Sequence, residues 1–374
     1  MNKFAPRGID TGSSIYLDSL RLISALTVVF VHTQAQLFPA RIHLSSPPVD
    51  VAHDAVVVFF VLSGFVIAHT TASNNRGARQ YALARLSRLY SVVIPALFLT
   101  AIIESVVKYA RYDLYEIYSR GVSWPRYLMA GSFLSEIWFF SAAPPMNGPL
   151  WSLSFEFWYY VIFGLWFYRN KGSRSFILPV AACFIAGPKI VLMMPIWMAG
   201  FAAYSLPKPG IDPKLRWAMV LLFLTLTMAL IMCLAPYPYK IRTTQFSYAG
   251  GFVTDWIIGL SVALGLWMLP LADRLMQQAG WINVFRKIAD LTFPIYVLHF
   301  PLLILWRTLF NYNIEHSWQL WQALVGICLV SAILGIIIEK QRFAWIYFFK
   351  WLISNIKLKS FHFYIIKILP KKII

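Results

Sequence analysis

The sequence predicts an all-α, polytopic integral membrane protein of about ten transmembrane helices. Hydrophobic residues make up 59% of its 374 residues and charged residues only 13%, whereas about a quarter of the residues in a soluble domain are charged. Apolar stretches of about 17 to 25 residues recur along nearly the whole chain, and each can cross about 30 Å of hydrocarbon as a helix. Helices are expected because a backbone in lipid must satisfy its own hydrogen bonds.

The apolar stretches place the predicted helices in order along the chain. The first stretch carries Arg21 and lacks a small-residue cleavage site, so we expect it to remain as a helix rather than to be removed as a signal peptide. Gly187 and Pro188 interrupt a later stretch and predict a broken pair of helices. The ten helices are expected at 15–37, 51–70, 89–107, 150–168, 176–187, 190–205, 215–236, 247–269, 288–310 and 318–339.

Lysine and arginine indicate the orientation of the chain in the membrane. With the N-terminus inside, the segments on that side hold 23 of the 33 basic residues and the segments on the other side hold 9. This asymmetry predicts that both termini are cytoplasmic, and it explains the net charge of +18 without nucleic acid as a partner. We expect one membrane domain over 1–340 and a basic, aromatic-rich cytoplasmic tail over 341–374.

Ionisable side chains inside predicted helices are costly and therefore indicate a functional cavity. Arg21 and His32 are eleven residues apart, which is about 16 Å and about three turns, so they share one face of the first helix. Arg21 is expected toward the cytoplasm and His32 toward the outside. Glu156 lies six residues inside the fourth helix, at a depth that matches His32. We therefore predict that this carboxylate meets and orients the imidazole as a catalytic pair.

Four further polar residues are supporting candidates. His53 and Asp54 open the second helix at a shallower level, and Tyr296 and His299 lie close to mid-membrane in the ninth. Hydrogen-bonded packing between helices is an equal alternative for Tyr296 and His299. The three cysteines lie in apolar stretches without metal or disulfide spacing, so no metal site is predicted.

Arg85 and Arg88 stand at positions i and i+3, which places two guanidinium groups on one face at the mouth of the third helix. Forked guanidiniums suit phosphate groups, although arginines at a helix mouth are also ordinary positive-inside anchors. Combined with the histidine and the carboxylate farther out, this pair predicts a phosphate-bearing donor that enters from the cytosol while the chemistry occurs deeper in the membrane.

Five stretches in this order resemble acyltransferase family 3, a family of integral-membrane acyltransferases, over nearly the whole chain. They are "LDSLRLISALTVVFVH", "VVVFFVLSGFVIA", "ARLSRLYSVVIPAL", "GPLWSLSFEFWYY" and "LTFPIYVLHFPLL". The resemblance implies a ten-helix fold that transfers an acyl group, most often acetyl, from cytosolic acyl-CoA to a glycan hydroxyl at the outer face. Acyl-CoA would then be a co-substrate, with no permanently bound cofactor.

The resemblance also implies roles for individual residues. The family's essential histidine matches His32 and its helix-one arginine matches Arg21. Its paired arginines match Arg85 and Arg88, and Glu156 stands where the family has a glutamate. In one departure, the family commonly has an aspartate in the second helix where this chain has a valine at position 57, and the aspartate at position 54, about one turn earlier, is a candidate to replace it.

Two functional hypotheses follow from these residues. The first is a membrane O-acyltransferase that O-acetylates a surface or exported polysaccharide or a glycolipid, with His32 as general base or as transient acyl carrier. The rival is a proton-coupled transporter or lipid-linked glycan flippase, in which His32 and Glu156 would relay protons. The lack of a clear internal repeat counts against the rival. A sensor or assembly partner with an inactive site is disfavoured because the whole polar set is present.

Overall fold

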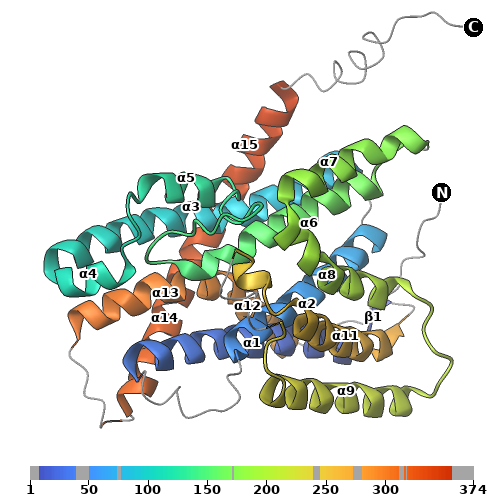
Figure 1. The fold of residues 1–374 in the computed structure, drawn as a ribbon. Coiled ribbons are helices and arrows are strands. Elements are labelled where there is room, and N and C mark those ends of the chain that lie inside the picture. Colours follow the sequence, from blue (N-terminus) through green and yellow to red (C-terminus); the bar gives the residue numbers. More distant parts are fainter. Residues whose placement is uncertain are drawn as a thin grey trace, which may run out of the picture.

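A computed structural model describes residues 8–38, 50–73, 77–170, 172–238, 245–272, 280–310, 316 and 318–355. Most of this described chain is helical, which confirms the all-α prediction, and Figure 1 shows the long helices lying side by side. The strands found in these ranges, β1 (Gly8–Ile9) and β2 (Leu271–Ala272), form one short antiparallel pair beside the start of the first helix.

The helices follow the predicted order along the chain. They are α1 (Thr11–Leu37), α2 (Val51–Ser73), α3 (Ala78–Ala110), α4 (Tyr112–Tyr118), α5 (Trp124–Gly131), α6 (Trp151–Phe167), α7 (Ile177–Ala186), α8 (Pro188–Ser205), α9 (Pro213–Cys233), α11 (Phe252–Met268), α12 (Gly280–Asp290), α13 (Thr292–Leu309), α14 (Trp318–Lys340) and α15 (Arg342–Asn355). Short 3₁₀ turns lie at η2 (Gly148–Leu150), η3 (Ser173–Phe176) and η4 (Ser247–Ala249).

Each of the ten predicted segments falls on a helix, but the predicted number of membrane spans is not confirmed. Within the described ranges, six helices are long and apolar enough to cross a membrane, namely α1, α2, α3, α9, α13 and α14. The bent pair of α7 and α8 makes a seventh if it counts as one span. Helices α6 and α11 have 17 residues each, about 25 Å, which is short of the roughly 30 Å hydrocarbon core. Helix α11 is apolar, so only its length keeps it out of the count, whereas α6 also carries Glu156 and two serines and is not one of the short apolar helices of the described chain.

Helix α2 is the most buried of the six candidate spans, and two glycines bring α8 against it. A Cβ atom at Gly64 of α2 would lie 1.9 Å from the carbonyl oxygen of Trp197. A Cβ atom at Gly200 of α8 would lie 1.9 Å from the carbonyl oxygen of Val61. Because no side chain fits at either contact, the two backbones touch directly, as small residues permit between membrane helices. This contact fixes the position of α2, which carries His53 and Asp54.

The predicted break near Gly187 is present as a bend of 119° between α7 and α8. Gly187 has a φ of +84°, and a Cβ atom there would lie 2.5 Å from the backbone of Trp138. Next to the bend, Lys189 Nζ lies 2.7 Å from Glu136 Oε2, and both side chains are fully buried. This ion pair ties the bend to the loop that follows α5. Packing against that loop accounts for the break that Gly187 and Pro188 predict.

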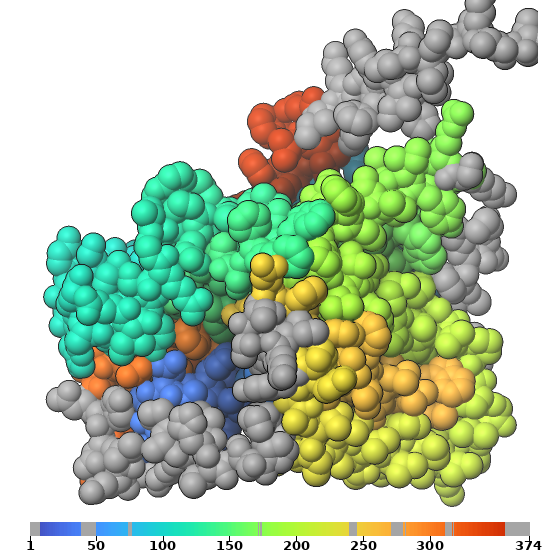
Figure 2. Space-filling view, viewed as in Figure 1, coloured from blue at the N-terminus to red at the C-terminus, as the bar shows by residue number. Residues whose placement is uncertain are grey.

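Helix α4 covers the end of the molecule at which α1 finishes. Figure 2 shows α4 as a cyan mass at that end, next to the blue end of α1. The hydroxyl of Tyr118, the last residue of α4, donates to Gln36 Oε1 near the end of α1. Arg307 of α13 donates to the same oxygen at 2.6 Å. Helix α4 therefore packs on the ends of α1 and α13, two helices that carry predicted site residues.

Helix α15 is the described part of the predicted tail. Trp345 and Phe349 pack against Tyr90 of α3, with ring centroids 5.8 Å and 5.2 Å apart. In Figure 1 this helix crosses the others and projects beyond them. The rest of the predicted tail, 356–374, lies outside the described residues.

Candidate active site

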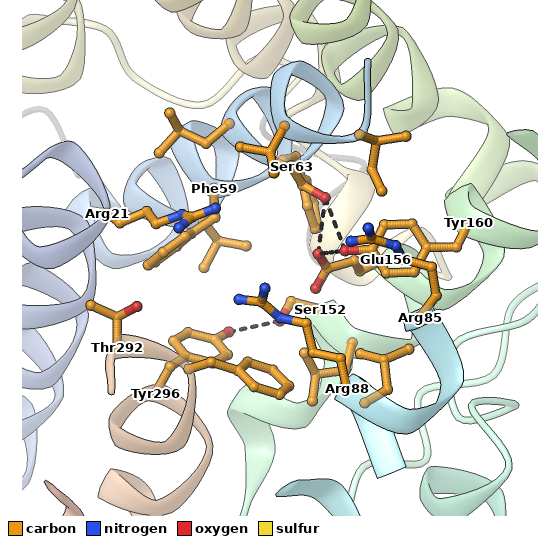
Figure 3. A pocket seen from close by; sticks show the side chains of 18 residues that line it. Arg21, Phe59, Ser63, Arg85, Arg88, Ser152, Glu156, Tyr160, Thr292 and Tyr296 are labelled. Carbon is orange, nitrogen blue, oxygen red and sulfur yellow. Dashed lines mark hydrogen bonds between the residues drawn. The ribbon is translucent and has the colours of Figure 1, made fainter. Parts of the chain in front are cut away.

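The three arginines predicted to bind a donor meet in one cavity, which we term the arginine cavity. It is lined by α1, α2, α3, α6 and α13. Figure 3 shows Arg21 directed into it from α1, and Arg85 and Arg88 directed into it from α3. Two helices that are separate in the sequence therefore place three guanidinium groups around one space.

The arginines of this cavity differ in how they are held. A guanidinium nitrogen of Arg21 lies 3.7 Å from the carboxylate of Asp18, one turn earlier in α1. Arg85 donates to a threonine hydroxyl at 3.4 Å and lies over the ring of Tyr160, 5.8 Å from its centroid. Among the described residues, neither Arg85 nor Arg88 has a carboxylate within 4 Å. Their charge is therefore available to an anionic ligand.

Glu156 lies in the arginine cavity and not beside His32, so the predicted contact between them is wrong. Ser63 Oγ donates to Glu156 Oε1 at 2.9 Å, and the hydroxyl of Tyr160 donates to the same oxygen. Trp197 Nε1 donates in turn to Ser63 Oγ at 3.2 Å. In the described part of the chain, no hydrogen bond or ion pair joins Glu156 to His32. The carboxylate thus faces the arginines from α6 (Figure 3).

The predicted contact is wrong because α6 begins deeper in the membrane than the prediction assumed. The prediction took Leu150 as the level of the membrane surface, but Pro149 and Trp151 line the same cavity as His32. The start of α6 therefore already lies at the level of His32. Glu156 is five residues farther along the helix, about 7.5 Å deeper, and this distance places it among the arginines.

A second cavity, which we term the histidine cavity, adjoins the first. It is lined in part by His32 and His53. Tyr296 and Val56 line both cavities, so the two meet at these side chains. The Tyr296 hydroxyl donates to the carbonyl oxygen of Pro149 at 3.0 Å, which holds the ring at this junction. A substrate group that moves from the arginines to His32 would cross the boundary formed by Tyr296 and Val56.

His32 is hydrogen-bonded to another histidine. Its Nδ1 lies 2.9 Å from His299 Nε2, and His299 Nδ1 lies 2.6 Å from the carbonyl oxygen of Tyr296. Because a carbonyl only accepts, His299 carries its proton on Nδ1, and its Nε2 is the acceptor in the neutral ring. His32 Nδ1 must then donate, so His32 Nε2 keeps its lone pair. This chain of bonds prepares one nitrogen of His32 as a base or nucleophile.

A proline and a buried asparagine support the turn that carries His299. Pro301 has no N–H, so it leaves the carbonyl of Val297 in α13 without its helical donor. Asn147, which is fully buried, donates from Nδ2 to that carbonyl at 3.1 Å. The position of His299 is thus fixed by a side chain from outside the helix.

His53 has an acidic partner that sequence reasoning missed. Its Nε2 lies 3.1 Å from Asp255 Oδ2 of α11, and its ring stacks on Trp151 at a centroid distance of 5.6 Å. A carboxylate inside an apolar helix was the available signal for Asp255. Asp54, the neighbour of His53 and another supporting candidate, is buried but does not line either cavity. The described residues contain no cluster of histidine, cysteine and acidic side chains that could hold a metal ion.

Comparison with known proteins decides the class of this site. Residues 14–340 match the family model described as an acyltransferase domain. The chain belongs to this acyltransferase family. It is also similar to the acyltransferase MdmB of Streptomyces mycarofaciens, with 28% identity over 212 residues, 54% of this chain and 51% of that relative. The match thus spans about half the length of that curated relative, and no solved structure matches the chain.

Membership in this family confirms the resemblance predicted from the five sequence stretches. Within the described ranges, six apolar helices of this family member are long enough to cross a membrane. Of the predicted site residues, the arginine cavity collects Arg21, Arg85, Arg88 and Glu156, and the histidine cavity collects His32 and His53. Tyr296 lies between the two cavities, and His299 contacts His32.

Proposed function

We propose that this acyltransferase moves an acyl group, with acetyl as the first candidate, from cytosolic acyl-CoA to a hydroxyl of a surface or exported polysaccharide or of a glycolipid. One observation carries the proposal: the arginine cavity and the histidine cavity meet at Tyr296 and Val56. A donor with a phosphate-bearing end and a reactive end needs two such neighbouring sites. The enzyme would lie in a bacterial inner membrane with both termini in the cytoplasm.

The arginine cavity suits the phosphate-bearing end of the donor. Arg85 and Arg88 offer forked donors that match phosphate oxygens, and no carboxylate among the described residues lies within ion-pair distance of either. With this cavity toward the cytoplasm, the donor enters without crossing the membrane. The thioester then reaches past Tyr296 toward His32, and the acceptor approaches from the opposite side.

The histidine cavity suits the chemical step. As a general base, His32 Nε2 takes the proton of the acceptor hydroxyl while the hydroxyl oxygen bonds to the acyl carbon. As an acyl carrier, the same nitrogen bonds to the acyl carbon first and passes the group on. In both routes the carbon–sulfur bond breaks and CoA leaves as its thiolate. Both also need the lone pair that the bond to His299 leaves on His32 Nε2.

The test uses the full chain purified in detergent, with acetyl-CoA as donor. The expected result is release of free CoA thiol, together with an acetylated glycan that disappears from the cell surface when the gene is deleted. Mass spectrometry of the surface glycan and a thiol assay measure the two. No thiol release and an unchanged glycan mass would contradict the proposal, since a transporter has no reason to cleave a thioester.

A further inference from the structure

His53 carries a buried nitrogen without a partner. Its Nε2 is held by Asp255 at 3.1 Å, while its Nδ1 has no hydrogen-bond partner and is shielded from solvent. The His53 side chain is only 9% exposed and lines the histidine cavity. Because a carboxylate accepts, it fixes the proton of the neutral ring on Nε2 and leaves the lone pair on Nδ1. An unpaired buried polar atom costs free energy, so a ligand that satisfies this nitrogen is favoured.

The histidine cavity therefore contains two imidazoles, each with one nitrogen fixed by a partner and the other carrying a lone pair. His32 donates to His299, and His53 donates to Asp255. If His32 Nε2 bonds to the acyl group, its lone pair is used and it cannot also take a proton from the acceptor. The second imidazole in the same cavity has the free nitrogen that this step requires. Its carboxylate partner stabilises the positive charge that it acquires.

We propose that His53 is a second catalytic base of this acyltransferase, which takes the proton of the acceptor hydroxyl when the acyl group leaves His32, with Asp255 as its positioning residue. The inference rests on the proposed function. It assigns the donor half of the reaction to His32 and the acceptor half to His53, and it fixes the acyl-carrier route for His32.

The two steps balance as follows. In the first, His32 Nε2 bonds to the acyl carbon, the carbon–sulfur bond breaks, and the CoA thiolate takes a proton from cytoplasmic water. The proton between His32 Nδ1 and His299 Nε2 stays in that bond. In the second, the acceptor oxygen loses its proton to His53 Nδ1 and bonds to the acyl carbon. The bond to His32 Nε2 then breaks, its electron pair returns to that nitrogen, and His53 releases its proton to water.

The test follows free CoA thiol after rapid mixing of the purified full-length protein with acetyl-CoA, with water as the acceptor. His53→Gln is expected to keep a burst of about one CoA per protein and to lose steady turnover by roughly a hundred- to ten-thousand-fold. Asp255→Asn is expected to keep the burst and to lose less of the steady rate. His32→Gln is expected to lose the burst itself. A merely structural role of Asp255 would lower the burst and the steady rate together.

His69→Gln is the matched control, because His69 lies in the same helix as His53 and lines neither cavity. It is expected to turn over as wild type does. Wild-type steady turnover by His53→Gln would overturn the inference, and so would loss of its burst while acetyl-CoA still binds. If His53→Gln does not accumulate in membranes, a wild-type steady rate in Asp255→Asn is the overturning result. Absence of CoA release from the wild type would instead overturn the proposed function itself.

Discussion

The arginine cavity and the histidine cavity share a wall but use their polar groups in opposite ways. In the first, Arg85 and Arg88 have no carboxylate within ion-pair distance among the described residues, so their charge is available to a ligand. In the second, His32 and His53 each use one ring nitrogen on a protein partner and keep one lone pair. In the proposed function, the first cavity would therefore bind the donor through charge, and the second would act through single nitrogen atoms.

Replacement of His32 is expected to have the largest effect. It should affect the chemical step in the histidine cavity and leave donor binding in the arginine cavity unchanged. His32→Gln keeps a polar side chain of similar size but cannot exchange a proton near neutral pH. We expect acyl transfer to fall by about a hundred- to ten-thousand-fold while acyl-CoA binding persists. Surface-glycan acylation in a deletion strain, compared with the amount of protein in the membrane fraction, measures this. Normal acylation would show that the reacting base lies elsewhere, and loss of the protein would favour a structural role.

Removal of the two arginines of α3 is expected to have the opposite effect, on donor binding rather than on the chemical step. Arg85→Ala with Arg88→Ala should weaken donor binding because each lost charge-assisted contact costs about 1.5 to 3 kcal/mol, or about one to two decades in Kd. Turnover at saturating donor should change much less. Equilibrium binding of acyl-CoA to the purified double variant measures the effect. An unchanged Kd would leave these arginines as ordinary anchors of membrane orientation.

Substitution of Glu156 is expected to have the smallest effect on donor binding. It should tighten binding, whereas loss of the arginines should weaken it. Its carboxylate shares a cavity with the arginines and repels an anionic donor. Glu156→Gln keeps the shape and removes the charge, so donor binding should tighten by about 1 kcal/mol, or about fivefold in Kd. Titration with acyl-CoA at low and high salt tests this. Weaker binding at both salt concentrations would mean that Glu156 holds the cavity in shape rather than setting its charge.

Sequence located the helices and most of the charged site, but not the lateral neighbours of each group. The ten segments that hydropathy predicted all fall on helices, because lipid demands apolar stretches of a set length, although the number of membrane spans is not confirmed. The cost of burying charge marked Arg21 and His32 as functional. Depth along a helix did not decide whether Glu156 or His299 contacts His32, since depth says nothing of which helices are adjacent. The role of Asn147 was also beyond prediction, because its carbonyl partner is freed by a proline on a distant helix.

The central claim is that a donor held by the arginines of one cavity reaches His32 in the next. A reactive CoA tests it most directly: a mixed disulfide of CoA with 2-thiopyridine, added to a His32→Cys variant. This variant is made in a chain whose native cysteines, Cys183, Cys233 and Cys328, are replaced by alanine. The introduced thiolate attacks the sulfur of CoA, forms a protein–CoA disulfide and releases 2-thiopyridone, which is measured by absorbance.

A cysteine at the neighbouring position provides the control for this measurement. Thr33 follows His32 in α1 but is fully buried and lines neither cavity, so Thr33→Cys should not react. The account predicts that the His32→Cys variant binds one CoA through the introduced thiol, and that it reacts much more slowly when Arg85→Ala and Arg88→Ala are added. Lack of reaction in the His32→Cys variant would contradict the claim that the two cavities form one path for the donor. A reaction rate that does not change when Arg85→Ala and Arg88→Ala are added would also contradict it.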